Sequence, residues 1–140
     1  MTLQTPLLLD TCAVVWFADD EVMAQRATDA LNHSFASGEP VYLSPITAWE
    51  IGMLCARGRM RFPMSPQAWF DRIQNAPGMA LAPMPPSVLM ASSFLPGLPP
   101  ADPADRILAA TAREFGFRLM TRDRPLLAYS DQGFIHALAC

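Results

Sequence analysis

Residues 101–112 read ADPADRILAATA, and the order of residue types in this stretch is that of a helix start. Asp102 is a good N-cap, and Pro103 suits the first helical position because its φ is already fixed near the helical value. Asp105 puts a second carboxylate in the first turn, where the helix dipole favours it. Apolar and small residues then recur at helical spacing as far as Gly116, which is a good helix end. The stretch therefore predicts a helix capped by Asp102.

Three other acids stand where acids are unusual. Asp10 ends the apolar run at residues 7–9, Glu50 lies in the apolar stripe of an expected helix, and Asp123 follows the strand-like residues 117–120. Buried glutamates are rare unless they are paired or bound to a metal. Together with the acid at position 105, these residues put four carboxylates at the ends of buried elements. This pattern predicts one acidic site.

Each acid also has a purely structural explanation. Asp10 fits a turn after a strand, Asp105 fits the helix dipole, and Glu50 faces solvent if the helix is rotated. These explanations must all hold at once to remove the site, so we favour the acidic site. For Asp102 the balance is the reverse, because Pro103 completes the start signal, and we favour a cap over a metal ligand.

Length and composition limit the class of protein. The 140 residues are 51% hydrophobic and 16% charged, which predicts a single domain over residues 1–140 with its own core. The net charge of −3 argues against a protein that coats nucleic acid by bulk charge, although a local basic rim is still possible. All ten basic residues are arginine, so a P-loop, which needs lysine, is excluded, and no Gly-x-Gly-x-x-Gly is present.

The sequence also bears on the compartment. No apolar run approaches the roughly 20 residues of a membrane span, so we expect no membrane association. Residues 1–5 lack the basic region of a signal peptide. The three cysteines and two histidines form no disulfide or zinc pattern, and we interpret the cysteines as small hydrophobic residues. We therefore expect a cytoplasmic protein.

Short apolar runs alternate with helical patterns along the chain. Seven of the fourteen prolines lie between residues 83 and 103, which predicts a stiff loop ahead of the Asp102 helix. The alternation predicts an α/β domain with a mostly parallel sheet of four to five strands. Strands are expected at 7–9, 41–43, 79–81, 117–120 and 133–136, with helices at 14–17, 22–37, after 45, after 66, at 87–94, after 102 and after 123.

The expected fold brings the four acids together. In an open parallel sheet, ligands bind beyond the carboxyl ends of the strands, where the strand order reverses. Asp10 and Asp123 each follow a strand at that edge, and Glu50 and Asp105 lie in the first halves of helices that start from it. Carboxylates packed together repel one another, and a hard cation such as Mg²⁺ or Mn²⁺ is the usual remedy.

Four blocks in a fixed order carry a resemblance to a known family. The blocks are LLDT at 8–11 with Trp16 downstream, SPITAWEI at 44–51 with RGR at 57–59, LPP at 98–100 before DPADRILAA at 102–110, and TRD at 121–123. In these blocks the sequence resembles the PIN-domain nucleases, and within them the VapC-type toxins of bacterial toxin–antitoxin pairs. The resemblance runs from residue 7 nearly to the C-terminus.

This resemblance implies a three-layer α/β/α fold and Mg²⁺-dependent endonucleolytic cleavage of RNA, with Mn²⁺ as a substitute. The family's metal ligands match Asp10 and Asp105. Glu50 and Asp123 complete the catalytic acids and reach the metal directly or through water. One or two ions fit this set. A metal so held would polarise a phosphate oxygen and activate a water, and Glu50 or Asp123 could take the proton of that water.

Further site residues follow from the same resemblance. Thr11 and Thr121 match positions where a hydroxyl supports the acids. The chain departs from many close relatives at residues 99–101, where it has Pro-Pro-Ala in place of a histidine shortly before the Asp-Pro-x-Asp motif, and we interpret this as tuning of the site.

Five arginines are candidates for holding the RNA backbone, and the first three form a cluster that suits a solvated helix end equally well. They are Arg57, Arg59, Arg61, Arg106 and Arg122. Four aromatic residues are expected in the core: Trp16, Phe17, Trp49 and Trp69. Trp16 or Phe17 could instead belong to an apolar patch that receives a partner.

Among functions, a ribonuclease toxin kept silent by a cognate antitoxin is the leading hypothesis, and we also expect a homodimer. A PIN nuclease acting in RNA processing or on structured DNA is the second hypothesis, and the small size of the chain favours the toxin over it. A catalytically silent binding module is the third, and four repelling carboxylates argue against it.

Overall fold

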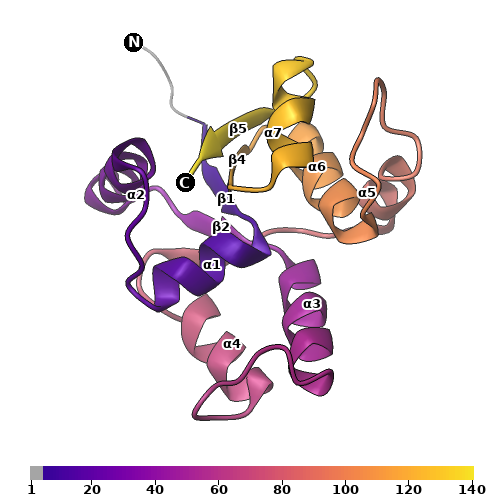
Figure 1. The fold of residues 1–140 in the computed structure, drawn as a ribbon. Helices are drawn as coiled ribbons and strands as arrows, with labels where there is room; N and C mark the ends of the chain where they lie inside the picture. Colours follow the sequence, from indigo (N-terminus) through magenta and orange to yellow (C-terminus); the bar gives the residue numbers. More distant parts are fainter. Residues whose placement is uncertain (1–4) are drawn as a thin grey trace.

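The computed structural model describes residues 5–140, and its elements alternate along the chain (Figure 1). They are β1 (Leu7–Leu9), α1 (Thr11–Ala18), α2 (Gln25–Ser37), β2 (Val41–Leu43), α3 (Pro45–Ala56), α4 (Pro66–Gln74), β3 (Met79–Leu81), α5 (Pro86–Ala91), α6 (Pro103–Phe115), β4 (Arg118–Thr121), α7 (Arg124–Asp131) and β5 (His136–Ala139). The expected alternation of strands and helices is confirmed.

The five strands form one sheet in the order β3-β2-β1-β4-β5, and each pair of neighbours is parallel. The central strand β1 consists of three leucines that are almost wholly buried, as a strand covered on both faces requires. From β1 the chain builds outward to β2 and β3 on one side and returns to β4 and β5 on the other. The strand order therefore reverses between β1 and β4, which fixes where a ligand site is expected.

Alternate side chains of β1 enter two different cores. Leu7 and Leu9 pack with residues of α1, α2 and α4, whereas Leu8 packs with residues of α6 and α7. Because successive side chains of a strand point to opposite faces, three leucines are enough to hold a helical layer on each side. The three-layer α/β/α fold expected from the sequence is confirmed.

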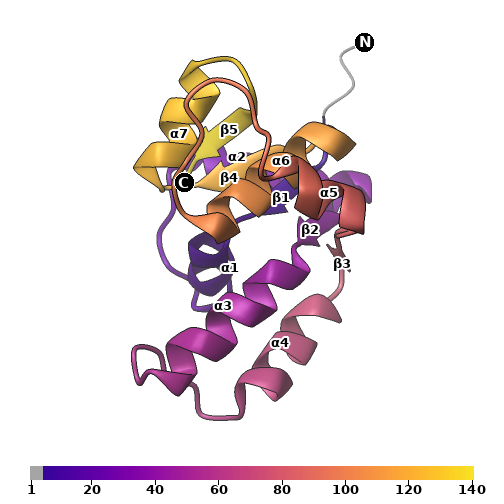
Figure 2. The ribbon, with the colours of Figure 1, turned by 90° about the vertical axis from the view of Figure 1, so that its right-hand side faces the viewer.

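Helices α3 and α4 extend away from the sheet as a pair, which Figures 1 and 2 show from two directions. Each begins with a serine cap followed by proline: the Ser44 hydroxyl oxygen accepts from the amide of Ile46 (3.1 Å), and that of Ser65 accepts from Ala68 (3.1 Å). The α3 start is the one that the sequence predicts. The pair contacts the rest of the domain at the end nearer the sheet, and its other end extends into solvent.

Two local predictions are corrected by the structure. Trp49, expected in the core, is 57% exposed, because α3 is apolar on all sides and its sequence does not define one buried face. The last strand begins at His136, later than expected, because Phe134 and Ile135 pack against the core from a turn that follows Gly133. Within residues 5–140 no helix combines the length and the apolar character that crossing a membrane requires.

Candidate active site

Asp10 lies at the carboxyl end of β1 and caps α1. Its Oδ1 accepts from the amide of Ala13 (2.7 Å), and its Oδ2 accepts from the hydroxyl of Thr121 at the end of β4. The side chain is buried, with 4% of the residue exposed. Burial raises the pKa of Asp10, the two hydrogen bonds oppose this, and the charge of Asp123 raises it further. The carboxylate is thus held in one orientation between the two central strands.

Thr121 links the acids that follow β1 and β4. Its hydroxyl donates to Asp10 and accepts from the amide of Asp123 (2.9 Å). Asp123 in turn caps α7, with its Oδ2 accepting from the amide of Leu126 (3.1 Å). The supporting role expected for the Thr121 hydroxyl agrees with this geometry, which places the acids at positions 10 and 123 on either side of the strand-order reversal.

Two threonine hydroxyls connect Glu50 to the same edge of the sheet. Thr11, directly after Asp10, donates to Glu50 Oε1 (2.5 Å), and its hydroxyl oxygen lies 3.1 Å from that of Thr47. Because Thr11 has a single hydroxyl hydrogen and gives it to the carboxylate, Thr47 supplies the hydrogen of the second bond. Burial raises the pKa of Glu50, the bond from Thr11 lowers it, and Asp102 and Asp10 raise it. Thr47 was not among the expected site residues, and only its place one turn before Glu50 could have indicated it.

Asp102 and Asp105 have the different roles that their positions suggest. Asp102 caps α6, and its Oδ1 accepts from the amide of Asp105 (3.0 Å). The pKa of Asp105 is raised to about 8, first by burial and then by the charges of Asp123, Asp102, Glu50 and Asp10. Burial and like charges therefore act in the same direction on Asp105. The cap expected at Asp102 is confirmed. Besides burial, the charges of Asp123, Asp102, Glu50 and Asp10 all raise the pKa of Asp105.

The four expected acids thus share one edge of the sheet, as a loose cluster. Burial and the charges of all four acids also raise the pKa of Cys12, which lies beside them on α1, to about 11. Among residues 5–140, however, no three His, Cys, Asp or Glu side chains are grouped so that they could hold a metal ion as they stand. Asp10 and Asp123 are turned toward helix amides and Glu50 toward Thr11.

The PIN domain family profile matches residues 7–131, most of the chain, including Asp10, Glu50, Asp105 and Asp123. This chain belongs to the PIN domain family.

Individual relatives of this PIN domain agree with that assignment. Ribonuclease VapC22 from Mycobacterium tuberculosis (strain ATCC 25618 / H37Rv) is 29% identical over 126 residues, which cover 89% of this chain and 92% of that protein. The structure of VapBC2 from Rickettsia felis bound to a DNA fragment from its promoter matches with a TM-score of 0.68, at 13% identity over 96% of this chain and 98% of that one. FitAcB from Neisseria gonorrhoeae matches with a TM-score of 0.56, at 20% identity over 94% and 96% of the two chains. At these identities the two structures show likeness of fold alone.

Two of the arginines expected to hold RNA are engaged within this PIN domain. Arg106 donates to three backbone carbonyls. Arg122 donates to the carbonyl of Val22 (2.9 Å), and its guanidinium carbon lies 3.7 Å from the centroid of the Trp16 ring. Sequence alone could not separate these two from the exposed arginines at positions 57, 59 and 61, because the difference lies in tertiary contacts.

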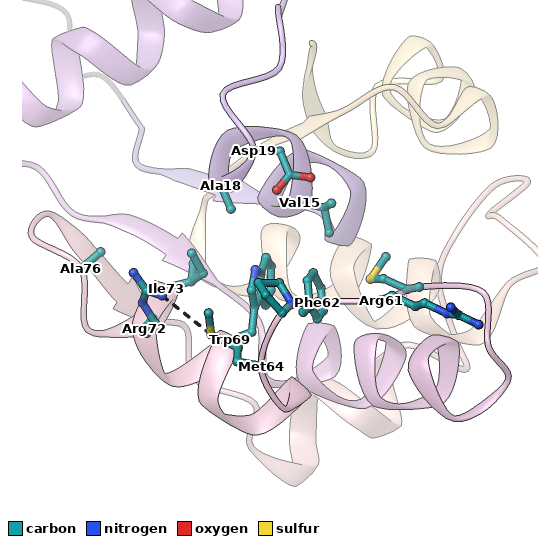
Figure 3. Close-up of a pocket in the computed structure, with 12 residues that line it drawn as sticks. Val15, Ala18, Asp19, Arg61, Phe62, Met64, Trp69, Arg72, Ile73 and Ala76 are labelled. Carbon is teal, nitrogen blue, oxygen red and sulfur yellow. Dashed lines mark hydrogen bonds between the residues drawn. The ribbon is translucent and has the colours of Figure 1, made fainter.

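An apolar groove of about 500 Å³ separates α1 from α4 and from the segment before α4 (Figure 3). Phe62 stacks on Trp69 along its floor, with ring centroids 4.3 Å apart. Charged side chains of both signs are found among its lining residues. The lining consists of Val15, Ala18, Asp19, Met60, Arg61, Phe62, Pro63, Met64, Trp69, Arg72, Ile73 and Ala76. This groove lies between α1 and the α3–α4 pair, and none of the four acids lines it.

Proposed function

We propose that this PIN domain is a Mg²⁺-dependent endoribonuclease and the toxin of a toxin–antitoxin pair. One observation carries the proposal: Asp10, Glu50, Asp105 and Asp123 share the carboxyl edge of the parallel sheet beside its strand-order reversal, close enough that the charges of the other acids add to burial in raising the pKa of Asp105. Strongly perturbed acids in such a place are typical of functional sites. The 29% identity to a protein named Ribonuclease VapC22 supports RNA as the substrate.

The residues fit a divalent cation by the chemistry of their donors. Four carboxylates at one edge of the sheet offer the hard oxygen ligands that Mg²⁺ and Mn²⁺ prefer. Asp10 and Asp105 would hold the cation, with Glu50 and Asp123 completing its surroundings directly or through water. Small adjustments of the acids would be needed to bring their oxygens onto one cation, and each carboxylate oxygen that accepts a hydrogen bond keeps a second lone pair for it. When bound, the cation would polarise a phosphate oxygen and lower the pKa of a water.

The chain's own residues then divide the remaining tasks. Thr121 and the Ala13 amide hold Asp10 in place, so this ligand loses little conformational freedom on binding. Thr11 occupies Oε1 of Glu50, which leaves Oε2 as the oxygen that takes a proton from an attacking water. The raised pKa of Glu50 makes it a stronger base than an ordinary glutamate. The exposed arginines at 57, 59 and 61 would contact RNA phosphates.

The test is cleavage of a single-stranded RNA by the purified protein in Mg²⁺ or Mn²⁺. We expect Asp10→Ala and Asp105→Ala each to abolish cleavage, and EDTA to do the same. Asp131→Ala, which removes an exposed acid at the end of α7, is the matched control and should cleave normally. Undiminished cleavage by either site variant, in preparations free of host ribonuclease, would rule the assignment out.

For the partner, we propose a cognate antitoxin whose segment binds the groove of Figure 3. The matching structures from Rickettsia felis and Neisseria gonorrhoeae are described as VapBC2 and FitAcB complexes, which supports a partner of this class. An apolar floor with both charge signs at hand suits an amphipathic peptide segment. Val15 and Ala18 on α1 form one wall, so a bulky charge there would block the segment.

Expression in a bacterial host tests the toxin role. The wild-type chain alone should arrest growth, and co-expression of the protein from the neighbouring reading frame should restore it. Ala18→Arg should arrest growth equally and resist rescue, because it fills the groove without touching the acids. Harmless expression of soluble, folded wild type would favour the alternative of a PIN nuclease without a toxin role. Absence of both cleavage and arrest would favour a silent binding module.

A further inference from the structure

The side chain of Arg106 connects the first turn of α6 to the backbone of the loop that precedes this helix. Its Nε donates to the carbonyl of Ser92 (2.8 Å), its Nη1 to that of Pro100 (3.1 Å) and its Nη2 to that of Ser93 (3.4 Å). The side chain is half-buried. All three guanidinium nitrogens are therefore directed at backbone oxygens of the chain itself. An arginine used in this way is poorly placed to bind an RNA phosphate.

The three carbonyls bracket one loop. Ser92 and Ser93 end α5, where helix carbonyls lack intrahelical partners and a cation is favoured. Pro100 lies at the other end of the loop, just before α6. Arg106 thus ties the two ends of the loop together. Tyr129 of α7 and the C-cap residue Gln132 hold the far part of the loop: Tyr129 donates to the carbonyl of Pro96 (2.6 Å), and the side chain of Gln132 bonds both the amide and the carbonyl of Leu98 (2.9 and 3.0 Å).

The same arginine closes the first turn of α6 around the acids. From position 106 its side chain returns to Pro100, and the segment between them contains Asp102 and Asp105. Within that segment Asp102 accepts from the amide of Asp105 through its side chain and from the amide of Arg106 through its carbonyl (3.0 Å each). The carboxylate of Asp105 is therefore carried by a backbone turn that is fixed from inside by Asp102 and from outside by Arg106.

We propose that Arg106 is a positioning residue that sets the place of the Asp105 carboxylate by locking the loop at residues 93–100 onto the start of α6. The proposal rests on the proposed nuclease function for its catalytic consequence, though not for its structural one. It replaces the expectation that Arg106 holds RNA. A displacement of a ligand by about 1 Å is enough to reduce turnover by about 100-fold.

The decisive variant is Arg106→Ala, with Arg113→Ala as its matched control. Arg113 lies on the same helix and also bonds a backbone carbonyl, that of Phe134 (2.7 Å), but near the end of α6 remote from the acids. We expect Arg106→Ala to lower kcat for RNA cleavage about 100-fold while KM and its salt dependence stay within about two-fold. Mn²⁺ affinity, followed by calorimetry, should fall about 10-fold. Arg113→Ala should change neither.

Amide hydrogen exchange supplies a readout that needs neither RNA nor metal. The amides of Asp105 and Arg106 should exchange at least 10-fold faster in Arg106→Ala, and at the wild-type rate in Arg113→Ala. If the alanine variant does not fold, Arg106→Lys is the substitute, because it keeps the positive charge and loses the planar guanidinium with its several donors. It should show the same changes in smaller measure.

The outcomes separate the hypotheses. A raised KM with unchanged kcat and a weaker salt dependence would make Arg106 an RNA contact and overturn the proposal. Unchanged kcat, KM and Mn²⁺ affinity, with stability alone reduced, would make it a merely structural residue and would also overturn it. If the wild-type protein cleaves no RNA, the proposed function falls. The exchange rate at Asp105 then decides the question by itself, because an unchanged rate in a folded Arg106→Ala protein refutes the positioning role.

Discussion

The two edges of the sheet carry opposite charges. At the carboxyl edge lie Asp10, Glu50, Asp105 and Asp123, which are buried or half-buried. At the amino edge Arg118, at the start of β4, lies with Arg26 and His33 around a polar hollow of about 320 Å³, which Asp29 also lines. Both sets gather charges of mainly one sign, and they differ in burial.

Burial makes the acidic cluster the more costly of the two, although Arg118 at the amino edge is also half-buried and its Nε has no hydrogen-bond partner among residues 5–140. Arg26 and His33 are exposed, so water screens them and their closeness costs little. Asp10 is almost wholly buried, and desolvation is the first cause of the raised pKa at Asp10, Glu50 and Asp105. Helices α1, α6 and α7 start at the acidic edge, and their positive ends offset part of this cost. A cluster of several desolvated charges of one sign, which the fold maintains at a cost, is a better candidate for function than one whose charges are mostly screened by water.

The largest expected difference between the edges is in turnover. Glu50→Gln should lower kcat roughly 100-fold, because the variant keeps the shape of the side chain and loses the base. At the amino edge, Arg118→Gln should leave kcat within about two-fold. Initial rates on one RNA at saturating Mg²⁺ measure both. A comparable loss in the two variants would erase the functional contrast between the edges.

A second difference concerns stability. Thr121→Val should lower the free energy of unfolding by about 2 kcal/mol, because it leaves buried Asp10 Oδ2 and the Asp123 amide without their partner. Thr111→Val is the matched control, since Thr111 is equally buried but bonds only the carbonyl of Ile107 in its own helix. Urea unfolding in EDTA compares them. Equal losses would mean that the hydroxyl bridge between β1 and β4 contributes nothing special.

Metal should stabilise the acidic edge by a smaller amount. At ten times Kd, Mg²⁺ should raise the stability of the wild type by roughly 1.4 kcal/mol, or a few degrees in Tm. Asp105→Asn should lose most of this gain, and in EDTA it should be as stable as the wild type or more stable by about 1 kcal/mol, because asparagine neither carries a repelling charge nor has to take up a proton on folding. A variant that is less stable in EDTA, beside a wild type indifferent to Mg²⁺ and Mn²⁺, would reduce Asp105 to a helix-dipole acid.

The weakest expected signal is a pH dependence in EDTA. The pKa of Asp105 is 3.8 in its ordinary state and about 8 in the fold, so between these values the unfolded chain loses the proton first. The stability contributed by protonated Asp105 is therefore full below pH 4 and is lost as pH rises toward 8. Solvent around this half-buried side chain makes the slope shallow. Melting curves from pH 5 to 8 should fall less steeply for Asp105→Asn, and parallel curves would contradict the raised pKa.

Much of the fold could be predicted from local sequence because local signals decide it. Asp102 followed by Pro103 begins α6 as expected, and Ser44 followed by Pro45 begins α3. The leucines of β1 predict a strand buried on both faces. The phase of α3 could not be predicted, since its sequence is apolar all round, and Trp49 therefore lies outside the core.

The acidic site could be predicted as a set of residues but not as a geometry. The acids at strand ends and helix starts converge because parallel topology brings those ends to one edge. The direction of the hydroxyl bonds at Thr47 and Thr121, and the commitment of Arg106 and Arg122 to backbone carbonyls, depend on contacts between residues far apart in sequence. No spacing rule along the chain contains that information.

The strand order also governs when the site can exist during synthesis. A chain emerges from the ribosome from its N-terminus, so β1 and Asp10 appear first, yet β1 acquires its neighbour β4 only when residues 118–121 have followed. Until then Asp10 lacks the Thr121 hydroxyl, and Asp123 has not been made. A PIN domain assembled in this order carries an incomplete centre for most of its translation; under the proposed function, the messenger RNA that encodes it would be spared until the chain is nearly finished.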